Sequence, residues 1–167
     1  GIELPSAIVA AGELEREKKV QQLFSTDYFR VYTSTDILGV ELGGAVKNCI
    51  AITSGISDGL GYGDNSRAAL ITRGLAEMSR FGEFFGADPK TFAGLAGMGD
   101  LIVTCTSKHS RNRGVGERIG KGEKVEDILS SMVMVAEGVP TLKAVKELAD
   151  KNGISMPIVN ATYGIVY

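Results

Sequence analysis

Helical periodicity from residue 36 onward is the feature that most constrains the fold of this chain. From that point the sequence consists of runs rich in Ala, Gly and Leu, with apolar residues at helical spacing and Gly-containing stops between the runs. Thr35 or Asp36 can cap the first of these helices, because both side chains accept hydrogen bonds from backbone N–H groups. We therefore expect residues 36–167 to form a helical domain.

Start and stop residues predict the individual helices. The first helix runs toward residues 55–61, and a second follows Asn65 and ends before Gly86, a residue that suits a left-handed C-terminal position. Asp88 and Pro89 open a third helix, because Asp caps helices and Pro fits their first turn. Shorter helices are predicted over residues 101–106, 112–119, 125–130 and 140–151. The apolar end of the chain shows no clear stop.

Strand signals occur only before residue 35. Residues 6–11 form a short apolar, β-branched run, residues 12–23 have a charged helical pattern, and residues 28–33 alternate like a strand. A single β-α-β unit does not make a stable parallel sheet, since its edges are unpaired and its faces uncovered. We interpret residues 1–35 as the end of a larger domain, which makes the fold class mainly α with a β-α-β remnant.

Composition and charge narrow the functional classes. The chain is 44% hydrophobic and 23% charged, as in folded globular proteins, and its net charge of −2 provides no basic field for nucleic acid. Cys49 and Cys105 lie in apolar runs and are expected to be reduced core residues, and no metal site is expected. With no secretory signal and no uninterrupted apolar run of eighteen residues, we expect a cytoplasmic protein without a membrane partner.

Lys47 occupies an unusual position for a cation. Its neighbours one turn away include Gly43, Gly44 and Ala51, so this side of the helix carries small side chains. Either the lysine reaches out of a packed helix to solvent, or it faces a cavity that the glycines leave open for a ligand. In the second case Lys47 can transfer a proton to a substrate, and Asn48 can add a hydrogen-bond donor.

A second polar segment follows a glycine-rich turn. Asp100 comes first, and Ser110-Arg111-Asn112-Arg113 stands at a predicted helix start. An Arg fork and free N–H groups at a helix start together suit a phosphate group. The alternative is a capped helix start with solvated arginines, in which Asp100 is also a plain cap. His109, the only histidine, is interpreted as a loop residue.

Two glycine-rich runs superficially suggest a dinucleotide-binding loop. They cover residues 58–64 and 114–120, but neither follows a strand and opens a helix within a β-α-β unit. We therefore reject both as nucleotide fingerprints. Arg67 and Arg73, on the second predicted helix, are interpreted as ordinary surface or inter-helix charges.

Three long segments in order, residues 41–82, 94–116 and 135–145, closely resemble the bacterial glycerol-3-phosphate dehydrogenase family. They include ELGGAVKN, GMGDLIVTCT and VAEGVPT, and the resemblance covers essentially the whole chain. It implies a Rossmann NAD(P)-binding domain, of which residues 1–35 are the last part. It also implies a helical substrate-binding domain of the 6-phosphogluconate-dehydrogenase-like type over residues 36–167.

The resemblance also implies an activity and roles for single residues. The family interconverts sn-glycerol 3-phosphate and dihydroxyacetone phosphate with NAD or NADP, for glycerophospholipid synthesis. Lys47 matches the catalytic lysine and also a substrate contact. The other matching substrate contacts are Asn48, Asp100, Ser110, Arg111 and Asn112, and the matching cofactor contacts are Arg111, Val135 and Glu137.

The family's glycine-rich loop and most of its sheet belong before residue 1, so this chain is expected to be inactive alone and carries no signal for NAD against NADP. A homodimer is compatible with the resemblance. Two other functions remain open: a non-catalytic helical dimerisation or binding module, and another dehydrogenase with a helical domain, such as a 6-phosphogluconate or hydroxy-acid enzyme.

Overall fold

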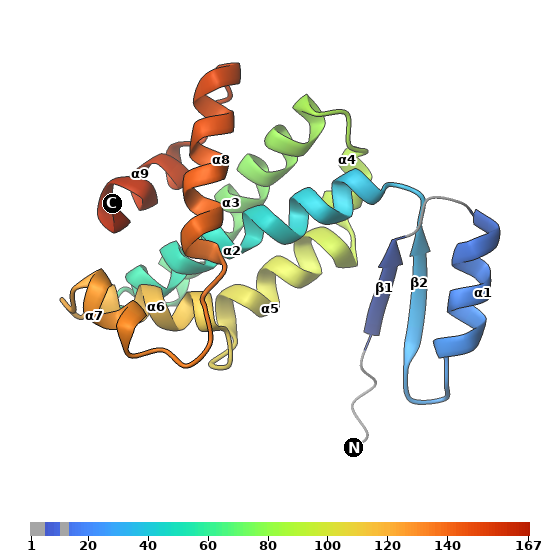
Figure 1. Ribbon diagram of the computed structural model, residues 1–167, viewed down its shortest axis with the longest axis horizontal. Coiled ribbons are helices and arrows are strands. Elements are labelled where there is room, and N and C mark those ends of the chain that lie inside the picture. The colour runs from blue at the N-terminus through green and yellow to red at the C-terminus, as the bar shows by residue number, and fades with distance from the viewer. Residues whose placement is uncertain (1–5, 11–13) are drawn as a thin grey trace.

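The computed structural model describes residues 6–10 and 14–167, which form a helical body with a small β-α-β unit at one end (Figure 1). The described elements are β1 (Ser6–Ala10), α1 (Leu14–Phe24), β2 (Arg30–Ser34), α2 (Ile37–Gly59), α3 (Asp64–Phe84), α4 (Pro89–Ala93), the π-helix η1 (Leu95–Gly99), α5 (Asp100–Thr106), α6 (Arg111–Gly120), α7 (Val125–Ser130), α8 (Gly138–Asn152) and α9 (Pro157–Val166).

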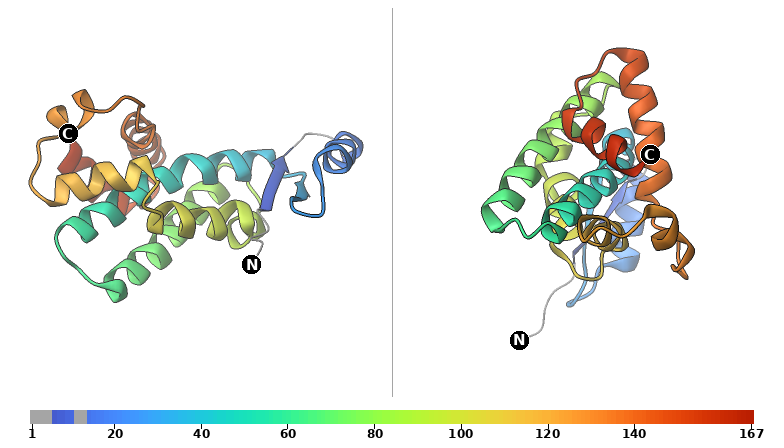
Figure 2. Two further views of the ribbon diagram at one scale, coloured as in Figure 1. Left: turned by 90° about the horizontal axis from the view of Figure 1, so that it is seen from below. Right: turned by 90° about the vertical axis from the view of Figure 1, so that its left-hand side faces the viewer.

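The predicted β-α-β unit is present. β1 and β2 pair in parallel, with Ser6 opposite Arg30 and Ala10 opposite Ser34, and α1 packs against both strands. The expected strand end at residue 11 and helix start at residue 12 lie outside the described residues. Within the described part of the chain the sheet has two strands, and the unit projects from one end of the helical body (Figure 2).

Asp36 connects the β-α-β unit to the helical body. Its side chain accepts a hydrogen bond from the Gly39 amide (2.9 Å) and so caps α2, as expected. The other carboxylate oxygen accepts hydrogen bonds from the Asp88 amide (3.0 Å) and the Thr91 hydroxyl (2.6 Å). Asp88 in turn caps α4 through the Lys90 amide. The two predicted caps therefore hold the starts of α2 and α4 together.

α2 is the central helix, with α3, α5, α6 and α8 packed against it (Figure 1). Its length and hydropathy would also suit a membrane span. However, 11 of its 23 residues are buried by the surrounding helices, among them Val46, Ile50 and Ile52. A core helix in a helical domain accounts for the same apolar composition.

The predicted short helices are confirmed to within two residues at each end. Gly86 follows the end of α3 with a φ of +93°, and Gly153 ends α8 with a φ of +66°, so both helices stop at left-handed glycines. Two elements, η1 and α9, were not predicted from the sequence.

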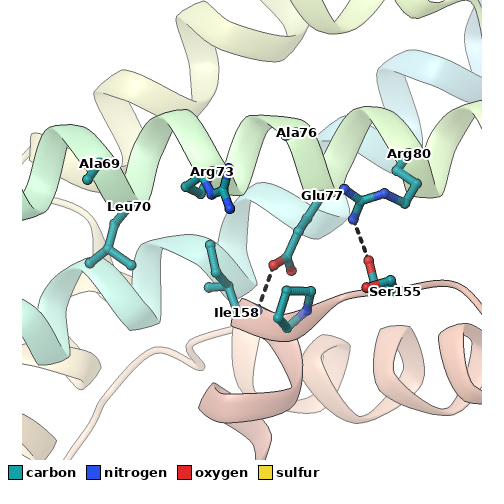
Figure 3. Close-up of a pocket in the computed structure, with 9 residues that line it drawn as sticks. Ala69, Leu70, Arg73, Ala76, Glu77, Arg80, Ser155 and Ile158 are labelled. Atoms are coloured by element: carbon teal, nitrogen blue, oxygen red, sulfur yellow. Dashed lines mark hydrogen bonds between the residues drawn. The ribbon is translucent and has the colours of Figure 1, made fainter.

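α9 begins against a buried carboxylate rather than a local cap. Glu77 of α3 accepts hydrogen bonds from the amides of Ile158 (2.6 Å) and Val159 (3.2 Å), and it lines a cavity of about 540 Å³ (Figure 3). Burial raises the pKa of Glu77, while these two hydrogen bonds oppose the rise. Arg80 donates to the Ser155 carbonyl in the same cavity. These contacts join α3 to the last helix.

Candidate active site

Lys47 lies in the middle of α2, where its ammonium group forms an ion pair with the carboxylate of Asp100 at the start of α5. The Lys47 side chain is 19% exposed, and the Asp100 side chain is 37% exposed. A Cβ on Gly44 would meet nothing within 4 Å, whereas Gly43 packs against Phe92 and the Ala96 carbonyl. Lys47 is therefore a half-buried, paired cation, and one of its two glycine neighbours leaves open space.

Thr104 extends this pair and was not singled out from the sequence. Its hydroxyl donates to the Asp100 carbonyl (2.6 Å) and lies 3.4 Å from one Asp100 carboxylate oxygen. The signal for it was present, because a residue four positions after Asp100 shares its face of the helix. Lys47, Asp100 and Thr104 thus form a connected polar group between α2 and α5.

The start of α6 borders a cavity of about 300 Å³ beside this polar group. Ser110 caps the helix by accepting a hydrogen bond from the Arg113 amide (3.3 Å), and the first N–H groups of a helix have no intrahelical partner. The residues that line the cavity are Val103, Thr104, Ser107, His109, Ser110, Arg111 and Asn112. His109 lies in the loop as expected, but it also lines this cavity.

Asn112 ties the start of α6 to the start of α8. Its side-chain oxygen accepts a hydrogen bond from the Gly138 amide (2.9 Å), and the residue is buried. A Cβ on Gly138 would lie 2.9 Å from the Asn48 carbonyl, so only glycine allows α8 to approach α2 this closely. The Asn48 side chain donates to the Gly44 carbonyl (3.1 Å), within its own helix.

Arg111, Val135 and Glu137 lie at the outer edge of this region. Arg111 is exposed and donates a hydrogen bond to the Val135 carbonyl (3.1 Å). The side chain of Val135 is exposed, and Glu137 occupies the N-cap position of α8 with an exposed side chain. This edge presents one accessible cation beside an accessible apolar side chain.

The contacts bring the candidate residues from four separate parts of the chain into one region of the helical body. α2 contributes Lys47 and Asn48, α5 contributes Asp100, the start of α6 contributes residues 110–112, and residues 135–138 complete it. A paired lysine can donate or accept a proton, and an arginine at a helix start can bind an anion. The arrangement thus places a candidate proton-transfer group in the same region as a candidate anion-binding group.

Arg113 does not belong to this set, although the sequence pattern placed it with Arg111. Its guanidinium donates to the Asp58 carboxylate (2.9 Å) and to Glu117 (3.0 Å), and its side chain is 12% exposed. Because α6 turns by about 100° per residue, side chains two positions apart point to different sides. One arginine faces the cavity and the other faces α2.

Both cysteines are buried and free, as expected, and burial raises the pKa of each thiol to about 12. Within residues 6–10 and 14–167, no group of three or more His, Cys, Asp or Glu side chains could hold a metal ion.

Comparison with known proteins identifies the family. A model of the NAD-dependent glycerol-3-phosphate dehydrogenase C-terminus matches residues 36–167. A glycerol-3-phosphate dehydrogenase [NAD(P)+] from Citrifermentans bemidjiense is 58% identical over 99% of this chain and 50% of its own length. The corresponding protein from Prosthecochloris aestuarii is 54% identical over 100% of this chain and 50% of its own length.

Solved structures agree with these relatives. Glycerol-3-phosphate dehydrogenase from Coxiella burnetii superposes with a TM-score of 0.95 at 41% identity, over 99% of this chain and 51% of that one. The enzyme from Saccharomyces cerevisiae superposes with a TM-score of 0.89 at 30% identity, over 99% of this chain and 51% of that one. The chain spans about half the length of the curated relatives it matches. It belongs to the NAD-dependent glycerol-3-phosphate dehydrogenase family, and its residues 36–167 correspond to the C-terminal domain of that family.

Proposed function

We propose that this chain is the substrate-binding half of an NAD(P)-dependent glycerol-3-phosphate dehydrogenase. The whole enzyme would interconvert sn-glycerol 3-phosphate and dihydroxyacetone phosphate in the cytoplasm, for glycerophospholipid synthesis. The observation that carries the proposal is the Lys47–Asp100 ion pair beside the cavity at the start of α6. It combines a proton-transfer group and an anion-binding helix start in a chain whose relatives are named for this reaction.

Lys47 provides the proton in our proposal. Reduction of the substrate ketone creates negative charge on its oxygen, and the Lys47 ammonium donates a proton there; in oxidation the neutral amine accepts it. Asp100 holds the ammonium group in place, and the Thr104 hydroxyl fixes the backbone carbonyl of Asp100. Asn48 stands beside Lys47 as a further donor for the substrate.

The phosphate group binds at the start of α6. The Arg111 guanidinium is exposed there, and the helix supplies unpaired N–H groups and the positive end of its dipole. Ser110 and Asn112 shape the same cavity. Binding the phosphate orients the ketone, at the central carbon of this small substrate, toward Lys47.

The residues of this chain fit one edge of a dinucleotide. Arg111 offers a cation and Val135 an apolar contact, and both are accessible beside Glu137. When bound, NADH or NADPH would supply the hydride for reduction of the ketone, and NAD or NADP would accept it in the reverse direction. We propose that residues 1–35 are the last β-α-β unit of the domain that binds the rest of this cofactor, since a two-stranded parallel sheet is normally part of a larger one.

The test is NAD(P)H oxidation with dihydroxyacetone phosphate by the full-length protein that contains this chain. Lys47→Ala is expected to lower kcat by roughly 10²-fold or more through loss of the proton-transfer group, with a smaller effect on KM. Lys121→Ala serves as the matched control, because Lys121 is a lysine outside the candidate site that is 58% exposed and pairs with Glu117.

Near-normal kcat in a folded Lys47→Ala protein would overturn the catalytic role. If the full-length protein prefers 6-phosphogluconate or another hydroxy acid, the proposed substrate is wrong. If it binds none of these compounds and only self-associates, the non-catalytic dimerisation or binding module is supported instead.

A further inference from the structure

We propose that Asp58 is a positioning residue for the phosphate-binding start of α6, and that it acts through Arg113. This inference rests on the proposed function, because it assigns Asp58 an effect on substrate binding. Asp58 lies near the C-terminal end of α2, away from the Lys47–Asp100 pair, and its side chain is only 6% exposed.

The two carboxylate oxygens of Asp58 serve two different helices. Oδ1 accepts from Nε (3.0 Å) and a terminal nitrogen (2.7 Å) of Arg67 on α3. Oδ2 lies 2.9 Å from Nε and 2.6 Å from a terminal nitrogen of Arg113 on α6. Asp58 is therefore a buried junction of α2, α3 and α6, and its contact with α6 uses one oxygen alone.

Besides its contact with Glu117, Arg113 is held at three further points. Its amide donates to the Ser110 hydroxyl (3.3 Å), and its guanidinium binds Asp58. Its carbonyl packs so closely on α2 that a Cβ on Gly55 would lie 2.0 Å from the carbonyl oxygen. Arg113 is the third residue of α6, so these contacts determine where the preceding turn begins.

The preceding turn contains the residues that face the cavity. Ser110, Arg111 and Asn112 all line it, and Arg111 provides the exposed cation. Without the Asp58 charge, a buried guanidinium is left partly unpaired, and the start of α6 is free to shift. A shift of this kind weakens phosphate binding. It leaves Lys47 in place, because Lys47 lies eleven residues before Asp58 on α2.

The experiment compares Asp58→Asn and Arg113→Gln with Arg67→Gln in the full-length protein. Asp58→Asn and Arg113→Gln are expected to raise KM for dihydroxyacetone phosphate about tenfold, with kcat within about threefold of wild type, because uniform binding is lost. The double variant should match either single variant, since both remove one interaction. Arg67→Gln removes the other arginine from the same carboxylate and should leave KM unchanged.

A structural role alone would lower the Tm of all three variants and leave KM unchanged, which would overturn the proposal. If Asp58→Asn does not fold, Arg113→Lys is the alternative variant, because it keeps the positive charge but lacks the planar guanidinium that binds Asp58 through two nitrogens. An unchanged KM in Arg113→Lys would also overturn the proposal.

Hydrogen exchange separates this proposal from the proposed function. Faster exchange of the amides of residues 111–114 in Asp58→Asn and Arg113→Gln, but not in Arg67→Gln, is expected whatever the reaction. That result in a full-length protein without dehydrogenase activity would retain the positioning role and reject the function. Unchanged exchange would reject the positioning role itself.

Discussion

At the scale of single residues, two arginines in one short segment have different environments. Arg111 is exposed and contacts the carbonyl of Val135, whereas Arg113 is held by Asp58 and Glu117. Both have the same side chain, so the difference lies in which side of α6 each occupies. Of the two, Arg111 is the one with an exposed side chain, and our proposal assigns it to the substrate phosphate.

We expect Arg111→Ala in the full-length protein to raise KM for dihydroxyacetone phosphate about ten- to hundredfold, since a charge-assisted hydrogen bond contributes about 1.5–3 kcal/mol. Some loss of kcat is also expected, because phosphate binding helps to orient the reacting ketone. Arg111→Lys, which keeps the charge without the fork, should show a smaller increase. Steady-state kinetics measures kcat and KM of the two variants. A KM for Arg111→Ala within about twofold of wild type would contradict the assignment of Arg111 to the phosphate.

Asp36 gives the stability of the fold a dependence on pH. Partial burial acts to raise the pKa of its carboxyl, but the hydrogen bonds from Thr91 and from the amides of Gly39 and Asp88 outweigh burial and hold it below the ordinary value of 3.8. A lowered pKa in the folded state favours the ionised form. The stability it contributes is therefore present above pH 3.8 and is lost as pH falls through the lower, folded-state value.

Asp36→Asn is expected to reduce the free energy of unfolding by about 1–3 kcal/mol at neutral pH, because an amide nitrogen replaces the oxygen that accepts from the Asp88 amide and the Thr91 hydroxyl. The cap of α2 itself is retained, since Asn caps helices as well as Asp does. The difference from wild type should shrink below pH 3.8, as Asp36 becomes protonated in the wild-type protein. Urea unfolding of both proteins at neutral and acidic pH measures it. A difference that stays constant down to the acid limit would show that the charge of Asp36 is unimportant.

At the scale of elements, glycines allow α2 and α6 to pack with their backbones in close approach. A Cβ on Gly116 would lie 1.9 Å from the Ile52 carbonyl oxygen, and one on Gly120 would lie 2.4 Å from that of Ile56. The glycine-rich run of residues 114–120, which superficially suggests a nucleotide loop, therefore lies within a helix and serves helix packing. The close approach also places the start of α6 beside α2.

Gly116→Ala should destabilise the domain by about 1–3 kcal/mol or more, because the added methyl group overlaps backbone atoms and α6 must move away from α2. Gly114→Ala is the matched control on the same helix, since its Cβ would meet nothing within 4 Å. The control should be neutral or stabilising by roughly 0.5–1 kcal/mol, through a better helix propensity. Thermal unfolding of the two variants compares them, and equal losses would contradict the packing role.

At the scale of the whole molecule, the substrate-side candidate residues all lie in the helical domain, whereas only a few candidate cofactor contacts do. The candidate cofactor contacts are Arg111, Val135 and Glu137, which lie close together. A dinucleotide site also needs a glycine-rich turn between a strand and a helix, which cradles the pyrophosphate. Neither glycine-rich run of this chain follows a strand.

We therefore expect the 167-residue chain alone to show no measurable dehydrogenase turnover. The assay is NAD(P)H oxidation with dihydroxyacetone phosphate by the purified chain, with the full-length protein as the positive control. Circular dichroism should show that the isolated chain is helical, so that loss of activity is not loss of folding. Clear turnover by the pure chain would contradict our division of the site between two halves.

Local chemistry in the sequence was enough to predict most of the helices. Asp36, Asp88 and Gly86 act on their own helix ends through hydrogen bonds and backbone geometry a few residues away, so their effects are visible in a short window. The same holds for the β-α-β unit, whose alternation and spacing are local. Local pattern also singled out Lys47, Asn48, Asp100 and residues 110–112. The family resemblance added Val135 and Glu137 and the specific roles, which remain predictions for the kinetic tests.

Tertiary structure alone decided which of those residues meet. Lys47 and Asp100 are 53 residues apart, and the first turn of α9 is held by Glu77, 81 residues before Ile158. The π-helix η1 and the split between Arg111 and Arg113 likewise depend on what packs against each helix face. Such contacts form because the folded chain brings distant segments together, and no short window of sequence contains both partners.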